Sequence, residues 1–305
     1  MTGINRREAM GLIAAATALG FGGAFAAPPS EGRALHMRRI PSSGEALPVV
    51  GLGTWQTFDV GPGEDERAPL AEVLSAFVAL GGRVIDSSPM YGRSEEVTGE
   101  LAEKLRLRDR LFVATKVWTR GKEAGIRQME ESMRKLRARP VDLMQVHNLL
   151  DVDTHLATLR EWKQQGLVRY IGITHYTAGS HDEVAAILRK HAVDFVQINF
   201  SAAEREAEQR LLPLAQERGV AVIVNRPFAG GEVIRQMRNR PLPPWAAEIE
   251  CSSWAQILLK YVTGHPAVTC AIPATSKLTH LRDNMQAGIG RLPDRKQREL
   301  IARSL

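Results

Sequence analysis

One β/α unit is visible at residues 81–96, which read GGRVIDSSPMYGRSEE. A short apolar run ends at Asp86, and Tyr91 follows five residues later in a turn. Ser94 has the residue type of a helix N-cap, ahead of an amphipathic helix expected over 95–105. An aspartate at a strand end is more often a turn or capping residue than a catalyst. This unit alone therefore does not indicate an active site, and similar units along the chain are needed as evidence.

Eight short apolar runs recur along the chain, bounded by Gly, Pro or charged residues as buried parallel strands are. Most successive runs end about 30 residues apart, the length of one βαβ unit. The last step is longer and is expected to hold an insertion over 229–252. The pattern predicts an α/β fold, a single (β/α)₈ TIM barrel over 35–305. The expected strands end at residues 53, 86, 116, 147, 173, 199, 225 and 272, and the other expected helices span 68–80, 124–137, 154–165, 180–190, 204–218 and 253–262.

The N-terminal part of the chain has a different character. Residues 1–26 carry the pair Arg6-Arg7, then an uncharged run rich in Ala and Gly, with small residues where a signal peptidase cleaves. This resembles a twin-arginine export signal cleaved near Ala26, which implies the twin-arginine export machinery as a partner and a periplasmic or otherwise exported protein. The alternative is a membrane anchor, because the uncharged run is long enough to span a bilayer.

A linker and a hairpin are expected between this signal and the barrel. Residues 27–34 contain Pro and Gly and have no periodic pattern. Two β-type runs, 35–40 and 46–49, then flank a Pro-Ser-Ser-Gly turn at 41–44.

Composition narrows the function classes. The 305 residues carry a net charge of +6 with 44% hydrophobic residues, enough for a sizeable core. Lys and Arg are interspersed with Asp and Glu, so no basic stripe indicates a nucleic acid partner. Cys251 and Cys270 lack the spacing of a metal site, as do the 8 histidines, and a disulfide between the two cysteines stays open.

Chemistry in a barrel of this kind sits at the carboxyl ends of the strands. Asp86, Lys116 and His147 end three successive runs, and Tyr91 lies in the loop after the first of them. A lysine ammonium beside a tyrosine lowers the phenol pKa, an aspartate holds that ammonium, and a neutral histidine can orient a substrate oxygen. The set contains no covalent nucleophile or metal cage, so it indicates proton donation paired with a hydride carrier.

Several motifs in order resemble the aldo-keto reductase family over nearly the whole chain after the signal. Each is weak alone, and their order and spacing make the resemblance strong. They are Gly51-Leu52-Gly53-Thr54-Trp55, Ile85-Asp86 with Met90-Tyr91-Gly92, Thr115-Lys116-Val117-Trp118, Val141-Asp142-Leu143 with Val146-His147, residues 166–172, Val196-Gln197-Ile198-Asn199, and Ile272-Pro273-Ala274-Thr275-Ser276 followed by Asn284.

The resemblance implies a reductase of small aldehydes or ketones that uses NADPH or NADH. Tyr91 is then the general acid, Lys116 tunes it, Asp86 pairs with Lys116, and His147 orients the carbonyl. Trp55 and Trp118 are implied to line the substrate pocket. The implied cofactor contacts are Thr54, Thr174, His175, Gln197, Asn225, Arg226, Phe228, Gly230, Ser276, Lys277, His280 and Asn284.

Three positions depart from the family pattern. After strand five the family has Ser-Asn, where this chain has Thr174-His175. After strand seven the family often stacks a tyrosine on the nicotinamide, where this chain has Asn225. His280 stands where many NADPH users carry a basic residue. Lys277 lies nearby and can supply positive charge to the 2′-phosphate of NADPH, so NADPH is favoured over NADH.

Two other function classes stay open. One is a regulatory or sensing protein that binds the cofactor with little turnover, which the Asn225 departure favours. The other is a cofactor-free lyase or isomerase that uses Lys116 to form a Schiff base.

Overall fold

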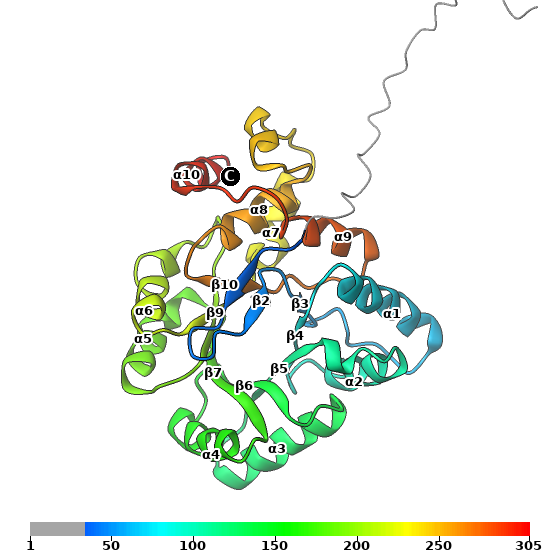
Figure 1. Cartoon of the computed structure of the whole chain (residues 1–305), viewed down its shortest axis with the longest axis vertical. Coiled ribbons are helices and arrows are strands. Elements are labelled where there is room, and N and C mark those ends of the chain that lie inside the picture. Colours follow the sequence, from blue (N-terminus) through cyan, green and yellow to red (C-terminus); the bar gives the residue numbers. More distant parts are fainter. Residues whose placement is uncertain (1–33) are drawn as a thin grey trace, which may run out of the picture. The chain divides into compact units, whose positions relative to one another are not determined.

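Eight parallel strands form the centre of the fold in the computed structural model, which describes residues 34–305 (Figure 1). They pair in chain order from β3 to β10. Parallel bridges between Val50 and Ala271 and between Gly53 and Ala274 join the first strand to the last, so the sheet closes into a barrel. The strands are β3 (Leu52–Gly53), β4 (Val84–Asp86), β5 (Phe112–Val117), β6 (Val141–His147), β7 (Val168–Thr174), β8 (Phe195–Asn199), β9 (Ala221–Asn225) and β10 (Val268–Ala271).

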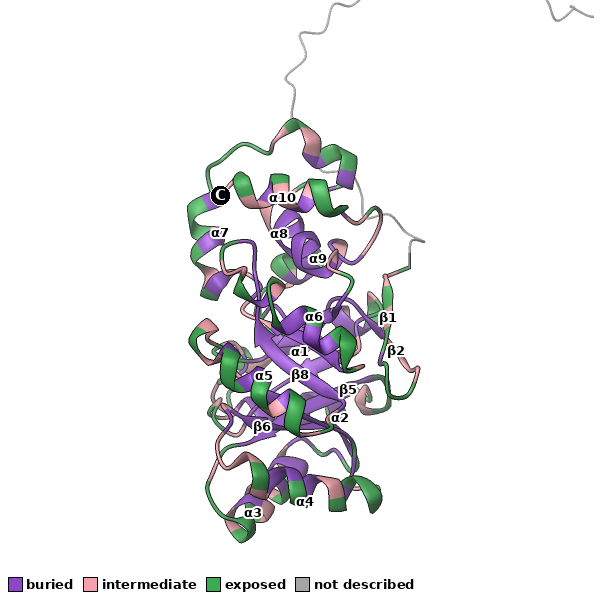
Figure 2. Cartoon of the chain, turned by 90° about the vertical axis from the view of Figure 1, so that its left-hand side faces the viewer, coloured by how far each residue is buried: buried purple, intermediate pink, exposed green. Residues whose placement is uncertain are grey.

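Helices surround the strands and turn their apolar faces inward, as the buried and exposed stripes in Figure 2 show. In α5, for example, Val184, Ala185 and Leu188 are buried, at the spacing of one helix face. The helices are α1 (Glu64–Ala79), α2 (Ser94–Lys104), α3 (Lys122–Lys135), α4 (Val152–Gln164), α5 (His181–Lys190), α6 (Leu211–Glu217), α7 (Glu232–Met237), α8 (Trp254–Thr263), α9 (Leu278–Gln286) and α10 (Arg295–Arg303).

A hairpin covers the amino-terminal end of the barrel. Its strands, β1 (Met37–Arg39) and β2 (Ala46–Pro48), pair antiparallel. Ile40 and Leu47 are fully buried in a cluster of barrel-interior side chains that includes Phe112 and Phe195. The hairpin therefore fills this end with apolar side chains and leaves the carboxyl ends of the strands as the open end.

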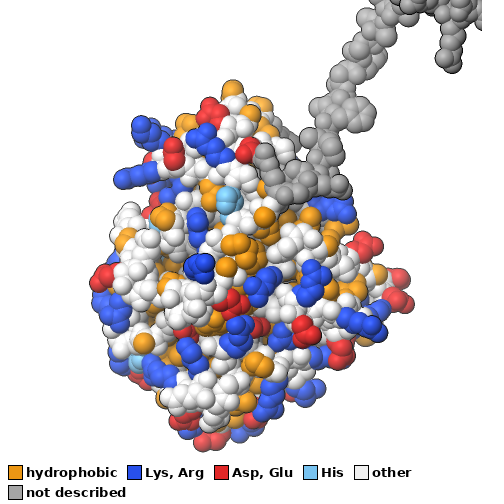
Figure 3. Space-filling view, viewed as in Figure 1, with side chains coloured by type: hydrophobic (Ala, Val, Ile, Leu, Met, Phe, Trp, Pro, Cys, Tyr) orange, Lys and Arg blue, Asp and Glu red, His pale blue; other side chains and the backbone are white. Residues whose placement is uncertain are grey.

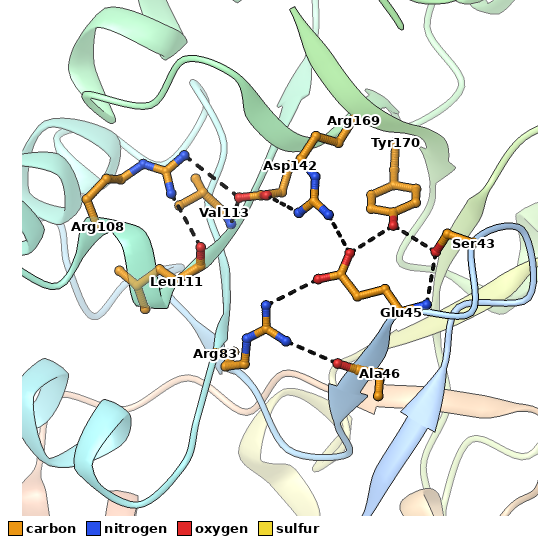
Figure 4. Close-up of polar contacts among 10 residues, drawn as sticks. All are labelled: Ser43, Glu45, Ala46, Arg83, Arg108, Leu111, Val113, Asp142, Arg169 and Tyr170. Carbon is orange, nitrogen blue, oxygen red and sulfur yellow. Dashed lines mark hydrogen bonds and ion pairs between the residues drawn. The ribbon is translucent and has the colours of Figure 1, made fainter. Parts of the chain in front are cut away.

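A polar network fastens the hairpin to the barrel (Figure 4). The carboxylate of Glu45 accepts hydrogen bonds from Arg83 at 3.2 Å, Arg169 at 2.5 Å and the Tyr170 hydroxyl at 2.8 Å. Arg169 also donates to Asp142 at 2.6 Å. Burial acts to raise the pKa of Glu45, but these hydrogen bonds and the arginine charges lower it below its usual range.

The predicted barrel and hairpin are confirmed, and most strands end within a residue or two of the expected positions. Two local predictions were wrong. The helix expected over 204–218 is reduced to α6 after a short 3₁₀ turn at Glu206–Glu208, because Pro213 has no amide hydrogen and fits only the first turn of a helix. Ser94 does not cap α2; it is the first helical residue, and its hydroxyl donates to the Thr54 carbonyl at 3.3 Å.

Three other sequence predictions concern the insertion, the two cysteines and the N-terminal segment. The insertion over 229–252 contains α7 and a 3₁₀ helix at Pro244–Ile249. Cys251 and Cys270 are both buried and free, and burial raises their thiol pKa values. The export signal at 1–26 and nearly all of the linker lie outside the described residues. Within residues 34–305 there is no helix with the length and apolarity needed to cross a bilayer.

Charges of both signs are mixed on the surface. Figure 3 shows Lys and Arg side chains interspersed with Asp and Glu over the face that carries the hairpin. The visible face therefore shows charges of both signs side by side and not a region of a single sign.

Candidate active site

Lys116 is the buried centre of the site. Its side chain comes from β5 and is fully buried, and its ammonium donates to Asp86 Oδ1 and to the Ser87 carbonyl, both at 2.6 Å. The same nitrogen lies 5.0 Å from the centre of the Tyr91 ring. β4 and β5 are neighbours in the sheet, which brings Asp86 and Lys116 together as the sequence predicted.

The charges of this group act on one another. Burial alone lowers the pKa of Lys116, but Asp86 and Tyr91 together raise it, so Lys116 is a stable ammonium. Burial raises the pKa of Tyr91, and Lys116 opposes this without reversing it. The net lowering of the phenol pKa that we expected is therefore absent in the free protein, and Tyr91 carries the proton that a general acid needs.

His147 faces the same group from the end of β6. Its ring centre lies 6.1 Å from that of Tyr91 and 6.5 Å from that of Trp118. Burial, with the nearby charge of Lys116, lowers the pKa of His147 to about 3. The imidazole is neutral at ordinary pH and can donate one hydrogen bond without bringing a charge.

Ser88 connects to the other side of this imidazole. Its hydroxyl oxygen lies 3.1 Å from His147 Nδ1 and accepts a hydrogen bond from the Met90 amide at 3.2 Å. We assign the hydroxyl hydrogen to the bond with Nδ1, which leaves the proton of the neutral ring on Nε2. Sequence reasoning did not select Ser88, although it lies two residues after Asp86 in the β/α unit at 81–96.

A second chain of hydrogen bonds reaches Asp86 across the barrel. Thr174 donates to Gln197 Oε1 at 3.2 Å, and Gln197 Nε2 donates to Asp86 Oδ2 at 2.8 Å. Gln145, another residue that sequence reasoning missed, points its amide nitrogen to the same oxygen at 3.4 Å. Asp86 is therefore held by Lys116 on one oxygen and by glutamines on the other.

A cavity of about 650 Å³ opens at the carboxyl ends of the strands, above this group. Met90, Asn148 and Tyr176, which we had not predicted, belong to its wall. The sequence-predicted residues in the wall are Thr54, Trp55, Asp86, Tyr91, Trp118, His147, Thr174, Gln197, Asn225, Arg226, Phe228 and Gly230.

Other predicted residues lie outside this wall. Lys116 lies beneath it. His175 stacks on Tyr176, at 5.5 Å between ring centres, and its ring nitrogens contact Thr177 and Ser180 instead of the cavity. The segment after β10 continues from the wall at Ala274 toward α9, where Ser276, Lys277 and His280 are exposed and Asn284 is buried.

Comparison with known proteins agrees with this geometry. A model of the aldo/keto reductase family matches residues 49–301. The chain belongs to the aldo/keto reductase family. It is 28% identical over 258 residues to the methylglyoxal reductase YeaE of Escherichia coli K12, which covers 82% of this chain and 89% of that relative.

Solved structures of aldo-keto reductases have the same fold. One from Klebsiella pneumoniae in complex with NADPH superposes with a TM-score of 0.74 at 25% identity, over 89% of this chain and 95% of that one. Another from the same organism, in complex with NADP and acetate, gives 0.73 at 26% identity over 86% and 92%. The family predicted from the motifs is thus confirmed.

The cavity of this aldo/keto reductase suits a nicotinamide nucleotide. Buried polar atoms of the wall have no hydrogen-bond partner within the described part of the chain, among them Asn225 Oδ1 and Arg226 Nε. Such atoms are costly unless a ligand or water pairs with them. Among residues 34–305 no cluster of His, Cys, Asp or Glu is arranged to hold a metal ion.

Proposed function

We propose that this aldo/keto reductase reduces a small aldehyde or ketone with NADPH, and that Tyr91 supplies the proton. The observation that carries the proposal is the position of Tyr91 at the cavity, between the buried ammonium of Lys116 and the imidazole of His147, with a phenol pKa that burial raises. A general acid for carbonyl reduction needs this combination, because the oxygen becomes an alkoxide as the bond to hydrogen forms at carbon.

Each side chain has a distinct task in the proposal. NADPH, when bound, supplies the hydride. His147 Nε2 donates a hydrogen bond that orients the carbonyl oxygen, and Tyr91 transfers its proton to that oxygen. Lys116 stabilises the tyrosinate that remains, and Asp86 keeps Lys116 charged and in place. Thr54, Thr174, Gln197, Arg226, Phe228 and Gly230 in the wall, with Ser276, Lys277, His280 and Asn284 beyond it, are the residues proposed to hold the nucleotide, and Trp55 and Trp118 border the substrate.

Tyr91→Phe tests the proton donor. We expect turnover to fall by about a hundredfold or more, while the Kd for NADPH, measured by fluorescence, stays nearly unchanged. Tyr170→Phe is the matched control, because Tyr170 belongs to the network at the opposite end of the barrel. Methylglyoxal is the first substrate to assay, since the relative named above is a methylglyoxal reductase. Equal turnover in Tyr91→Phe and the wild type would refute the role.

The same assay separates the reductase from a sensing protein. Tight NADPH binding without turnover on a panel of aldehydes, ketones and quinones would favour the sensing function. A Schiff-base lyase is disfavoured by the state of Lys116, because a nucleophilic amine must be neutral and this ammonium is held by Asp86 and Ser87.

We further propose that the protein is exported through the twin-arginine route. Support comes from Arg6-Arg7 and the uncharged run that follows, within residues 1–26. That route carries folded proteins, so the nucleotide would be bound before export. Mass spectrometry of the protein from cell fractions should find a periplasmic form that begins near residue 27. An intact N-terminus in the membrane fraction would favour an uncleaved anchor instead.

A further inference from the structure

Asn225, at the end of β9, belongs to the cavity wall, and one atom of its side-chain amide has no hydrogen-bond partner in the described part of the chain. Asn225 Nδ2 donates to the backbone carbonyl of His175 at 3.1 Å. A carbonyl oxygen can only accept a hydrogen bond, so the atom facing it must be the amide nitrogen, and the orientation of the amide is fixed. Asn225 Oδ1 is then the other polar atom of this amide; it is buried and has no partner in the described part of the chain.

Two neighbouring residues in the wall, Thr174 and Gln197, already use their donor groups in hydrogen bonds within the protein. Thr174, at the end of β7, uses its hydroxyl hydrogen on Gln197 Oε1. Gln197 uses its amide nitrogen on Asp86. Of these three strand-end side chains, only Asn225 has a buried polar atom without any hydrogen-bond partner in the described part of the chain, so a ligand with an N–H group would satisfy it.

His175 and Asn225 have exchanged the residue types that the family resemblance assigns to their positions. The resemblance places an amide after β7 and an aromatic ring after β9, and this chain has an imidazole and an amide there. The imidazole turns away from the cavity, with Nδ1 accepting from the Thr177 amide at 3.3 Å and Nε2 3.1 Å from the Ser180 hydroxyl. The hydrogen bond from Asn225 to the His175 carbonyl places the amide of Asn225 directly beside position 175, where the family pattern has an amide.

We propose that Asn225 Oδ1 accepts a hydrogen bond from the carboxamide N–H of the nicotinamide, in place of the amide missing at position 175. This inference rests on the proposed use of a nicotinamide nucleotide and adds the residue that recognises its carboxamide. It also gives the departure at Asn225 a function in cofactor binding, because an amide that cannot stack like a ring can still select a carboxamide.

The test compares two ligands that differ in this group. NADP⁺ has a carboxamide, and its 3-acetylpyridine analogue has a methyl ketone with no N–H. Both are titrated against the full-length protein by tryptophan fluorescence, since Trp55 and Trp118 line the cavity. We expect the wild type to prefer NADP⁺ by roughly fivefold, the weight of one neutral hydrogen bond. Asn225→Ala should bind both ligands equally and keep its affinity for the analogue within about twofold of the wild type.

Asn148→Ala is the matched control. Asn148 lies in the same wall with an unpartnered Oδ1, but it follows His147 at the end of β6 and not β9. This variant should keep the preference for NADP⁺. If Asn225→Ala keeps the preference, or if the wild type binds both ligands equally, the role of Asn225 is refuted and the reductase proposal stands. If neither ligand binds the wild type, the proposed function itself fails.

Discussion

Ser88 lies between the Met90 amide and the imidazole of His147, and we assign it control of the proton position on that ring. Ser88→Ala leaves Nδ1 of His147 without its partner, so both neutral tautomers become accessible. We expect kcat for carbonyl reduction to fall about three- to tenfold, with the Kd for NADPH unchanged. The discriminating measurement is the ¹⁵N NMR spectrum of His147, which should show one dominant Nε2–H tautomer in the wild type and a mixture in Ser88→Ala. An unchanged spectrum would contradict the assignment.

The pKa values of His147 and Tyr91 predict a flat pH profile. With its pKa lowered to about 3, His147 is neutral at mildly acidic and neutral pH, and the raised pKa of Tyr91 keeps the phenol protonated beyond its usual range. Proton donation by Tyr91 is lost only when the pH rises through that raised pKa. We expect kcat/KM for reduction to be level from about pH 5 to about pH 9. A break near neutrality would mean that another group titrates in the free enzyme.

At the scale of elements, α2 packs against the end of α3 through a position that has no room for a side chain. A Cβ on Gly99 would lie 2.0 Å from the Lys135 carbonyl oxygen and 2.7 Å from the Leu136 carbonyl carbon. Alanine in a helix interior normally stabilises by up to about 1 kcal/mol relative to glycine. Here we expect Gly99→Ala to lower the free energy of unfolding by about 2 kcal/mol, because backbone atoms must shift.

Chemical denaturation followed by circular dichroism measures this effect. Gly179→Ala is the control, since a Cβ there meets no atom within 4 Å, and its unfolding free energy should change by less than about 0.5 kcal/mol. A higher free energy of unfolding for Gly99→Ala than for the wild type would show that α2 and α3 can move apart enough to accommodate the added methyl group.

Elements were easier to predict than the orientation of side chains. The strand ends at Asp86 and His147 follow from short apolar runs that recur about every 30 residues, and barrel topology then brings them together. The direction of the His175 ring depends on contacts with Thr177 and Ser180, which form only once the loop after β7 is folded. The pKa of Tyr91 likewise depends on the depth of burial, which the pattern of residue types does not give.

At the scale of the whole molecule, the two ends of the barrel have separate tasks. The cavity occupies the carboxyl ends of the strands, and the Glu45 network closes the opposite end. Since the pKa of Glu45 is lowered by folding, its contribution to stability is present above the unfolded pKa near 4.5 and is lost as pH falls through the lower folded value. The loss of this network should therefore lower the free energy of unfolding and leave the rate of carbonyl reduction unchanged.

Glu45→Gln tests this separation. We expect the variant to be less stable than the wild type by about 1 kcal/mol at pH 7, a modest value because both arginines are partly exposed. The difference should shrink as pH falls below about 4.5, while kcat at pH 7 stays the same. Thermal unfolding across this pH range measures it, with the exposed Glu217→Gln as control. A stability difference that does not change with pH would contradict the ionic account.

The closure of the barrel has a consequence for the growing polypeptide. The bridges that complete the sheet join residues 50 and 53 to residues 271 and 274. The second edge of the first strand can therefore pair only after nearly the entire chain has been synthesised. Until β10 leaves the ribosome, the nascent chain carries two open strand edges, which invite pairing with other chains. Protection by a chaperone during synthesis is therefore most valuable late, just before the last strand emerges.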